Sequence, residues 1–167
     1  MNDTLTKDHT DIRADKRVVR KAGSYFVSPD SIPWTSFPFP DTQFKLLSVN
    51  FERGSITLIL RAGPKALTPL HKHIGAAELF VLNGWFSYEE GKGTKGDFVY
   101  EAGGVIHIAE AGNGVEALIV FQGPIVGLDD NHGVTGIIDA ELVYALAKAN
   151  NATAHIDNSL AAMADSI

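Results

Sequence analysis

The sequence predicts one all-β domain, an antiparallel sandwich or barrel, followed by a short C-terminal helix. Two observations carry this prediction. Between residues 43 and 121, short runs rich in Val, Ile, Leu and Phe alternate with glycine-containing turns, a pattern typical of closely spaced antiparallel strands. The chain has 167 residues, 45% of them hydrophobic and 20% charged, so it can bury a single core of ordinary size.

Turn signals divide this region into its expected strands. A turn is expected at Asn83-Gly84, and other glycine-containing turns are expected at 52–54, 91–93, 103–104 and 112–114. The expected strands are Gln43–Phe51, Ser55–Ala62, Glu78–Leu82, Trp85–Glu89, Asp97–Tyr100, Val105–Glu110 and Val115–Phe121.

Four segments are expected along the chain. Residues 1–21 are polar and are expected to form a flexible arm. Residues 22–42 carry Pro29, Pro33, Pro38 and Pro40 with aromatic residues between them, which predicts an extended segment that packs on the barrel. Residues 43–138 form the barrel. Residues 139–167 form a helix, expected over Asp139–Ala149 with Asp139 as its cap, and a peripheral alanine-rich tail.

Composition excludes several classes of protein. The formal net charge is −6 and the basic residues are scattered, which argues against a nucleic-acid partner. No apolar run is long enough to span a membrane, and the first residues lack the apolar region of a secretory signal. The chain has no cysteine, so disulfides and thiolate sites are excluded. We therefore expect a soluble, cytoplasmic protein without a membrane partner.

The histidines suggest a metal site. His71 and His73 are two residues apart, and in a strand such residues point to the same face. A pair of imidazoles needs further ligands to hold a divalent ion firmly, and Glu78 and His107 are the candidates. A histidine pair alone is common on strand surfaces, but this combination within a glycine-marked all-β frame favours a metal site.

The same residues resemble the two motifs of the cupin family. The first motif is matched by Gly63, His71, His73, Glu78 and Gly84. The second is matched by Gly96, Gly104 and His107, with Ala102 in place of its proline and Ala111 in place of its asparagine. The resemblance implies a single cupin barrel, also called a double-stranded β-helix or jelly roll.

A closer resemblance is to the cupin dioxygenases that cleave β-diketones, the acetylacetone dioxygenase type, with dihydroxyacetophenone dioxygenase as a related case. It extends over residues 67–146, and includes Glu101 six residues before His107 and the segment 121–124. It implies Fe(II) on His71, His73 and His107, Phe121 in the substrate pocket and Glu101 in the outer shell. It also implies a small ketone and O₂ as substrates. Barrels of this kind often pair, so we expect a homo-oligomer, a dimer or a tetramer.

Three histidine ligands suit this chemistry. Neutral imidazoles leave the charge of Fe(II) uncompensated and three octahedral positions open, so an enolate can bind through two oxygens and O₂ through the last position. Glu78 is a fourth ligand in the general cupin pattern, but it stays off the metal in the closer family, and the charge argument favours the second arrangement. If Glu78 faces inward, strand alternation places Phe80 and Leu82 in the pocket as well.

Other interpretations remain open at this point. Zn²⁺, Ni²⁺ or Mn²⁺ also suits histidine ligands, and a cupin with such a metal could be an isomerase or a decarboxylase. The chain could also be a non-catalytic cupin that binds a small ligand. The sequence does not specify the substrate, the products or the metal.

Overall fold

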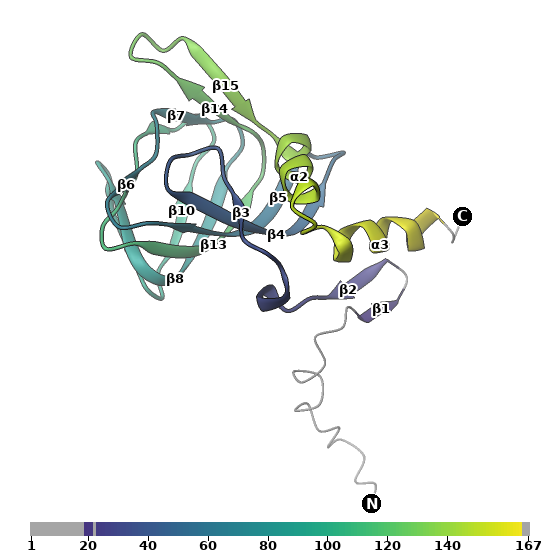
Figure 1. Cartoon of the computed structure of the whole chain (residues 1–167). Coiled ribbons are helices and arrows are strands. Elements are labelled where there is room, and N and C mark those ends of the chain that lie inside the picture. The colour runs from purple at the N-terminus through teal and green to yellow at the C-terminus, as the bar shows by residue number, and fades with distance from the viewer. Residues whose placement is uncertain (1–18, 22, 165–167) are drawn as a thin grey trace, which may run out of the picture. The chain divides into compact units, whose positions relative to one another are not determined.

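The computed structural model describes residues 19–21 and 23–164, which fall into two compact units (Figure 1). The smaller unit contains described residues up to Ser31 and from Ala154 onward. Most of the arm expected at 1–21 lies outside the described residues. The elements of this unit are β1 (Val19–Lys21), β2 (Ser24–Phe26), the 3₁₀ helix η1 (Pro29–Ser31) and α3 (Ala154–Ala164).

Helix α3 lies in the alanine-rich C-terminal tail, for which the sequence predicted no helix. Alanine has the highest helix propensity of all residues, so an alanine-rich segment can form a helix without a strong apolar stripe. Within the smaller unit, Ser159 donates a hydrogen bond from its hydroxyl to the carbonyl of Gly23, and the His155 ring lies 5.4 Å from the ring of Tyr25. These contacts connect α3 to β2 and to Gly23, which precedes it.

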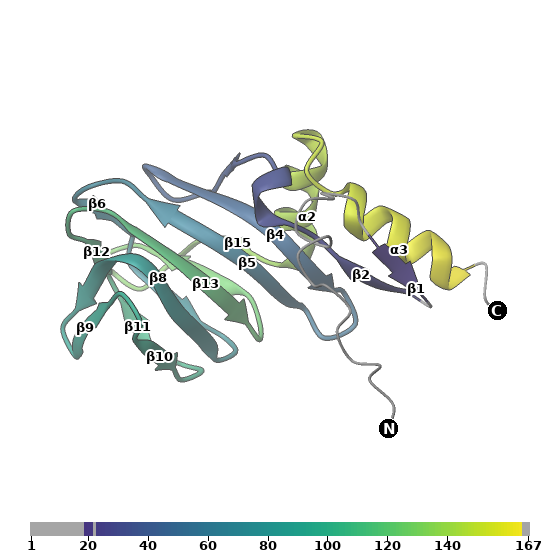
Figure 2. The same ribbon diagram turned by 90° about the horizontal axis from the view of Figure 1, so that it is seen from below.

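The larger unit, Ile32–Thr153, is the expected β barrel, built from two sheets. Figure 2 shows β4, β5, β13 and β8 side by side. The nine-stranded sheet has the order β3-β4-β5-β13-β8-β12-β6, and β9 and β10 also pair with β8. Its strands are β3 (Thr35–Ser36), β4 (Thr42–Asn50), β5 (Ser55–Ala62), β6 (Ala66–Leu67), β8 (Ala77–Tyr88), β9 (Gly91–Thr94), β10 (Phe98–Glu101), β12 (Glu110–Ala111) and β13 (Val115–Phe121).

The second sheet has four strands in the order β11-β7-β14-β15. They are β7 (His71–His73), β11 (Ile106–His107), β14 (Ile125–Leu128) and β15 (Val134–Ile138). Every strand pairing among the described residues is antiparallel, which confirms the all-β prediction.

The turn predicted at Asn83-Gly84 is wrong, because β8 continues through it. Gly84 has a φ of +71°, a conformation that favours glycine, and it pairs with Val115 of β13. Two residues before it, the pairing of β8 with β13 shifts by one residue. Asn83 pairs with Glu116 and Val81 with Ala117, so Leu82 is the extra residue of a β-bulge. The glycine does mark an unusual backbone conformation. The strand continues through it because its first half pairs with β13 and its second half pairs with β9.

The bulge changes which residues of β8 face the interior. Before it, the buried side chains are Leu79 and Val81, whereas after it Phe86 is buried. The buried positions are odd-numbered on one side of the bulge and even-numbered on the other. Strand alternation therefore cannot be carried past Leu82.

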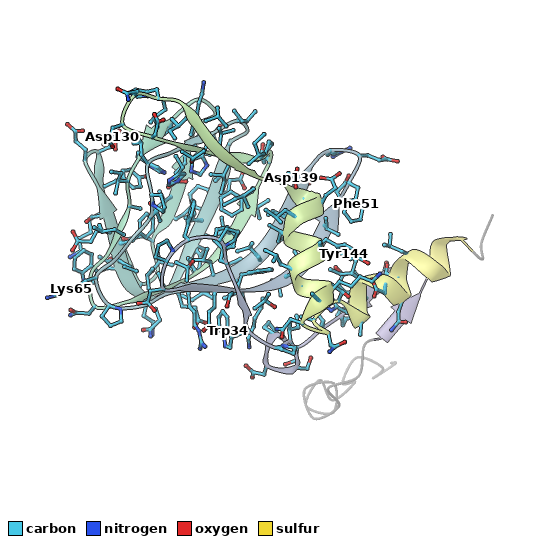
Figure 3. The ribbon with its side chains drawn as sticks, turned by 45° about the horizontal axis from the view of Figure 1, so that its top comes forward. Trp34, Phe51, Lys65, Asp130, Asp139 and Tyr144 are labelled. Atoms are coloured by element: carbon cyan, nitrogen blue, oxygen red, sulfur yellow. The ribbon has the colours of Figure 1, made fainter. Side chains whose placement is uncertain are left out.

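Helix α2 (Ala140–Ala149) confirms the predicted C-terminal helix and its cap. The Asp139 side chain accepts a hydrogen bond of 2.8 Å from the Leu142 backbone N–H. Val143 is fully buried, and the Tyr144 ring meets Phe51 edge-on at 5.3 Å (Figure 3). Among the described residues, neither helix has the length and apolar character that a membrane span requires.

Candidate metal site

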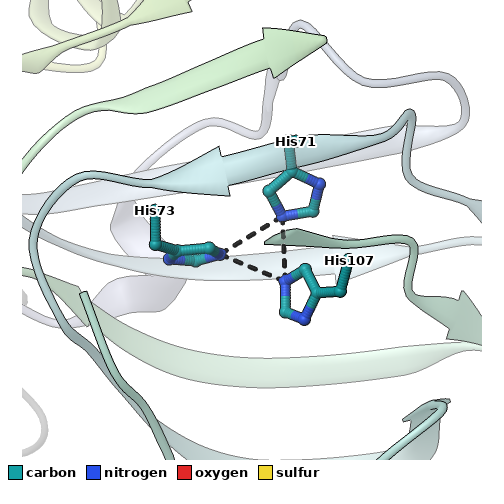
Figure 4. A group of neighbouring side chains, drawn as sticks. All are labelled: His71, His73 and His107. Carbon is teal, nitrogen blue, oxygen red and sulfur yellow. Dashed lines mark hydrogen bonds between the residues drawn. The ribbon is translucent and has the colours of Figure 1, made fainter. Parts of the chain in front are cut away.

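Three histidine side chains converge inside the barrel (Figure 4). His71 and His73 both point inward from β7, and His107 on β11 is the direct cross-strand partner of His71. The Nε2 atom of His71 lies 3.2 Å from that of His73 and 3.1 Å from that of His107, and the third separation is 3.2 Å. The structure therefore brings together all three histidines that the sequence singled out.

This spacing fits one metal ion. With metal–nitrogen bonds of about 2.1 Å, neighbouring ligand atoms are ~3.0 Å apart at right angles and ~3.4 Å apart in a tetrahedron. The Nδ1 atom of His71 donates to the carbonyl oxygen of Pro69 at 2.8 Å, so its Nε2 presents a lone pair. The Nδ1 atom of His107 is buried and has no hydrogen-bond partner among the described residues. The donor set suits Fe(II), Zn²⁺, Ni²⁺ or Mn²⁺ and does not select between them.

Burial keeps the imidazoles neutral. It lowers the pKa of His71 to about 4, and the nearby His107 adds to this effect, while the hydrogen bond to Pro69 partly opposes it. Burial, with repulsion from His71 and His107, lowers the pKa of His73 to about 3. The pKa of His107 is also lowered, chiefly by burial. Near pH 7 all three are thus in the form that binds metal.

Glu101 is the carboxylate beside the cluster. It ends β10 opposite Ala77, is buried, and places Oε2 3.4 Å from Nε2 of His73. Burial first, and then the charge of Glu90, raises the pKa of Glu101 to about 7. A cation at the histidines would favour the ionised carboxylate. The sequence-based prediction placed Glu101 in the outer shell, and the structure places it in the cavity wall.

Glu78 is not brought to the histidines. Its Oε1 atom accepts a hydrogen bond of 3.0 Å from the Gln122 side-chain amide, and it does not line the cavity. The neighbouring residue Leu79 is buried there instead, opposite Ile119. Because side chains alternate along a strand, Glu78 lies on the other face of β8.

The inward positions predicted for Phe80 and Leu82 are wrong, because both predictions depended on an inward-facing Glu78. Phe80 is 45% exposed, and neither residue lines the cavity. The prediction took Glu78 as an inward residue, and Phe80 and Leu82 share its face. Phe121, the third predicted pocket residue, does line the cavity.

Each histidine has one aromatic ring beside it. The Phe121 ring stacks on His73 at 6.0 Å, Phe39 lies 5.2 Å from His71, and Tyr88 lies 4.7 Å from His107. Sequence reasoning missed Phe39 and Tyr88 as site residues. Phe39 lies in the proline-rich segment that was expected to pack on the barrel. That expected packing was the one sequence feature that could have indicated Phe39 as a site residue. The inward position of Tyr88 depends on the bulge at Leu82.

The histidines lie in a largely apolar cavity that opens to solvent. Its wall is made mainly of aliphatic and aromatic side chains, and among the described residues Glu101 is its only carboxylate. The described wall residues include no lysine or arginine. A bound cation would therefore be the main positive charge that a ligand meets there.

Comparison with known proteins agrees with this architecture. The model of the family described as "ChrR Cupin-like domain" matches residues 22–126. No curated protein matches the chain.

Several solved structures share the fold. An acetylacetone dioxygenase from Acinetobacter johnsonii is 21% identical, with a TM-score of 0.67 over 81% of this chain and 95% of that chain. A proposed acetylacetone dioxygenase from Methylibium petroleiphilum is 24% identical, with a TM-score of 0.70 over 77% and 97%. An RmlC-like cupin from Ralstonia eutropha is 21% identical, with a TM-score of 0.69 over 74% and 83%. At these identities the likeness establishes the cupin fold.

Proposed function

The chain belongs to the ChrR cupin-like domain family, and on this premise we propose that it is a mononuclear non-haem Fe(II) dioxygenase. Its reaction would cleave a C–C bond of a β-diketone or a related aryl ketone with O₂. One observation carries the proposal: His71, His73 and His107 hold three neutral Nε2 atoms 3.1–3.2 Å apart in a cavity with apolar walls.

The charge of the site favours an enolate. All three donors are neutral, and the described residues of the cavity wall include no lysine or arginine. A bound Fe(II) would supply open coordination positions and the electron density that activation of O₂ requires. An anionic substrate would thus be attracted to the cation that the three histidines hold.

The residues around the histidines have distinct roles in this proposal. The Pro69 carbonyl fixes the orientation of His71 through Nδ1. The carboxylate of Glu101 is placed to take the proton that a diketone loses when it becomes an enolate. Phe39, Phe121 and Tyr88 cover the imidazoles and exclude water from the reacting atoms.

Oxygen uptake with Fe(II)-loaded protein and a panel of small diketones tests the proposal. We expect one O₂ consumed per substrate cleaved, and label from ¹⁸O₂ in both fragments, because the two oxygen atoms end in different products. Zn²⁺-loaded protein is the matched control and should not consume O₂, because zinc has no redox chemistry. Turnover under argon would contradict the proposal and indicate an isomerase or a decarboxylase. Binding without turnover under any of these conditions would indicate a ligand-binding cupin.

A further inference from the structure

The cavity extends well beyond the three histidines. Three chain segments form its wall. Each begins at or beside a histidine, and the wall residues further along it are mostly small. From His107 the inward-facing residues are Ala109 and Ala111, and from His71 they are Thr68 and Ala66. On β13, Phe121 stacks on His73, and Ile119, Ala117 and Val115 follow it along the wall.

These three segments converge at one rim of the barrel. Ala111 is the cross-strand partner of Ala66, and Val115 is the partner of Ala62. The Lys65 backbone N–H donates to the Ala111 carbonyl at 2.7 Å. Because a strand rises about 3.3 Å per residue, the four residues of β13 from Phe121 to Ala117 cover about 13 Å. The cavity therefore has a histidine end and, about 13 Å away, an alanine-lined end.

The alanine-lined end offers few polar groups to a ligand. Among the described residues of this wall, the Thr42 hydroxyl donates to the Phe39 carbonyl at 2.6 Å, and the Thr68 hydroxyl accepts from the Ala109 N–H at 2.8 Å. The other side chains that line the cavity away from the histidines are mainly alanine, larger aliphatic and phenylalanine side chains. Open apolar space of this kind destabilises a fold unless a ligand fills it, because the lining atoms lose contacts.

We propose that the substrate carries an extended, uncharged apolar substituent that occupies the alanine-lined end while its oxygen atoms face the three histidines. This inference rests on the proposed function and specifies its substrate class, a long-chain or aryl-extended diketone. This specificity is determined by the alanines that line the cavity away from the histidines: Ala62, Ala66, Ala109, Ala111 and Ala117.

A chain-length series tests the inference by binding rather than turnover. Co²⁺-loaded protein is titrated under argon with straight-chain β-diketones from pentanedione to tridecanedione, and the cobalt absorption spectrum reports binding. We expect affinity to rise about threefold to fourfold with each added methylene, the gain expected for burial of that group, until the alanine-lined end is full. A diketone of equal length that ends in a carboxylate should bind more than about tenfold more weakly, because its charge would be buried without a partner.

Two alanine positions at different depths make the test specific. Ala109→Leu should end the gain in affinity at a shorter chain than Ala111→Leu, because Ala109 is closer to His107. Ala66→Leu, across the strand pair from Ala111 and only half-buried, replaces Ala111→Leu if that variant does not fold. Ala102→Leu is the matched control, since Ala102 is exposed and outside the cavity wall, and it should follow the wild-type series.

The outcomes separate this inference from the proposed function. Equal affinities for short and long diketones in the cobalt titration would overturn the inference of an apolar substituent and would leave the proposed function unaffected. A spectrum that responds to no diketone would overturn both. A chain-length dependence that survives Ala109→Leu and Ala111→Leu unchanged would also overturn the inference.

Discussion

The Oε2 atom of Glu101 lies 3.4 Å from Nε2 of His73, although the two residues belong to different sheets of the barrel. Glu101 ends β10 in the nine-stranded sheet, and His73 ends β7 in the four-stranded sheet. A carboxylate that contacts a metal-binding imidazole affects both its orientation and its basicity. The candidate site therefore depends on how the two sheets are held together.

Glu101→Gln should weaken metal binding by about 10- to 100-fold, the range typical of residues that support a ligand. The amide keeps the shape of the side chain but removes its charge. Glu78→Gln is the matched control and should bind metal nearly as wild type does, because Glu78 contacts Gln122 and not the histidines. Competition with a chromogenic chelator measures both affinities. Metal loss in Glu78→Gln as large as in a histidine variant would show that Glu78 is a ligand.

His107→Ala should empty the site while the barrel still folds. Two imidazoles hold a divalent ion weakly, and the aliphatic core around Leu46 and Leu58 lies apart from the ligands. Metal content after dialysis against a chelator gives the occupancy, and far-UV circular dichroism reports the fold. His132→Asn, in an exposed loop, should keep its metal. Full occupancy in His107→Ala would contradict the ligand assignment.

Metal-free protein should lose stability as the pH falls from about 6.5 to about 4. His71 and His73 have folded-state pKa values of about 4 and about 3, below the ordinary value of 6.5. Between these values and 6.5 the unfolded chain takes up protons that the folded chain does not, so acid favours unfolding. Urea unfolding at a series of pH values measures the slope. His73→Leu should make it shallower, and an unchanged slope would contradict burial of a neutral imidazole.

In the same metal-free protein, Glu101 affects the pH dependence of the free energy of unfolding in the opposite direction to the histidines. Its pKa is raised from 4.5 to about 7, so its contribution to stability is complete below pH 4.5 and is lost as the pH rises through 7. Glu101→Gln should therefore lose less stability than wild type between pH 5 and 8. A wild-type protein and a Glu101→Gln variant with parallel pH profiles over this range would contradict the raised pKa.

Gly84→Ala should destabilise the barrel more than Gly54→Ala. Both glycines have a positive φ, +71° and +64°, so an alanine is strained by about 1 kcal/mol at either position. A Cβ at Gly84 would also overlap the carbonyl oxygen of Gly114, whereas one at Gly54 meets open space. Overpacking of this kind costs about 1–3 kcal/mol more. Urea unfolding gives the difference, and equal destabilisation would show that β8 tolerates a side chain at position 84.

Local patterns predicted much of this molecule. Short apolar runs located most strands, and the Asp139 cap located α2, because these depend on neighbouring residues. The convergence of His71 and His73 also followed from alternation within a single short strand. The contact between Glu101 and His73 could not be located in this way, since it depends on the pairing of β10 with β8 and on the packing of two sheets.

The prediction of which β8 residues face inward was wrong for a different reason. The sequence does not distinguish a glycine that ends a strand from one that lies within a strand beside a bulge, because both can need the same backbone conformation. The strands β13 and β9 decide between them, because they pair with the two halves of β8. The place of Leu79 in the cavity wall and the contact of Tyr88 with His107 therefore depend on the strand order.

The bulge at Leu82 makes the wall over His107 sensitive to the length of β8 as well as to its composition. Phe86 and Tyr88 face the interior because one extra residue precedes them without taking a place in the alternation. Deleting Leu82 would remove the bulge and leave these residues on their present face. A residue inserted between Asn83 and Phe86 would instead act on the side chains as a frameshift acts on codons: the residues downstream would keep their identities and exchange their faces. Tyr88 would turn away from His107 with all three histidines still in place. In this barrel an insertion far from the ligands can change the site as thoroughly as a substitution within it.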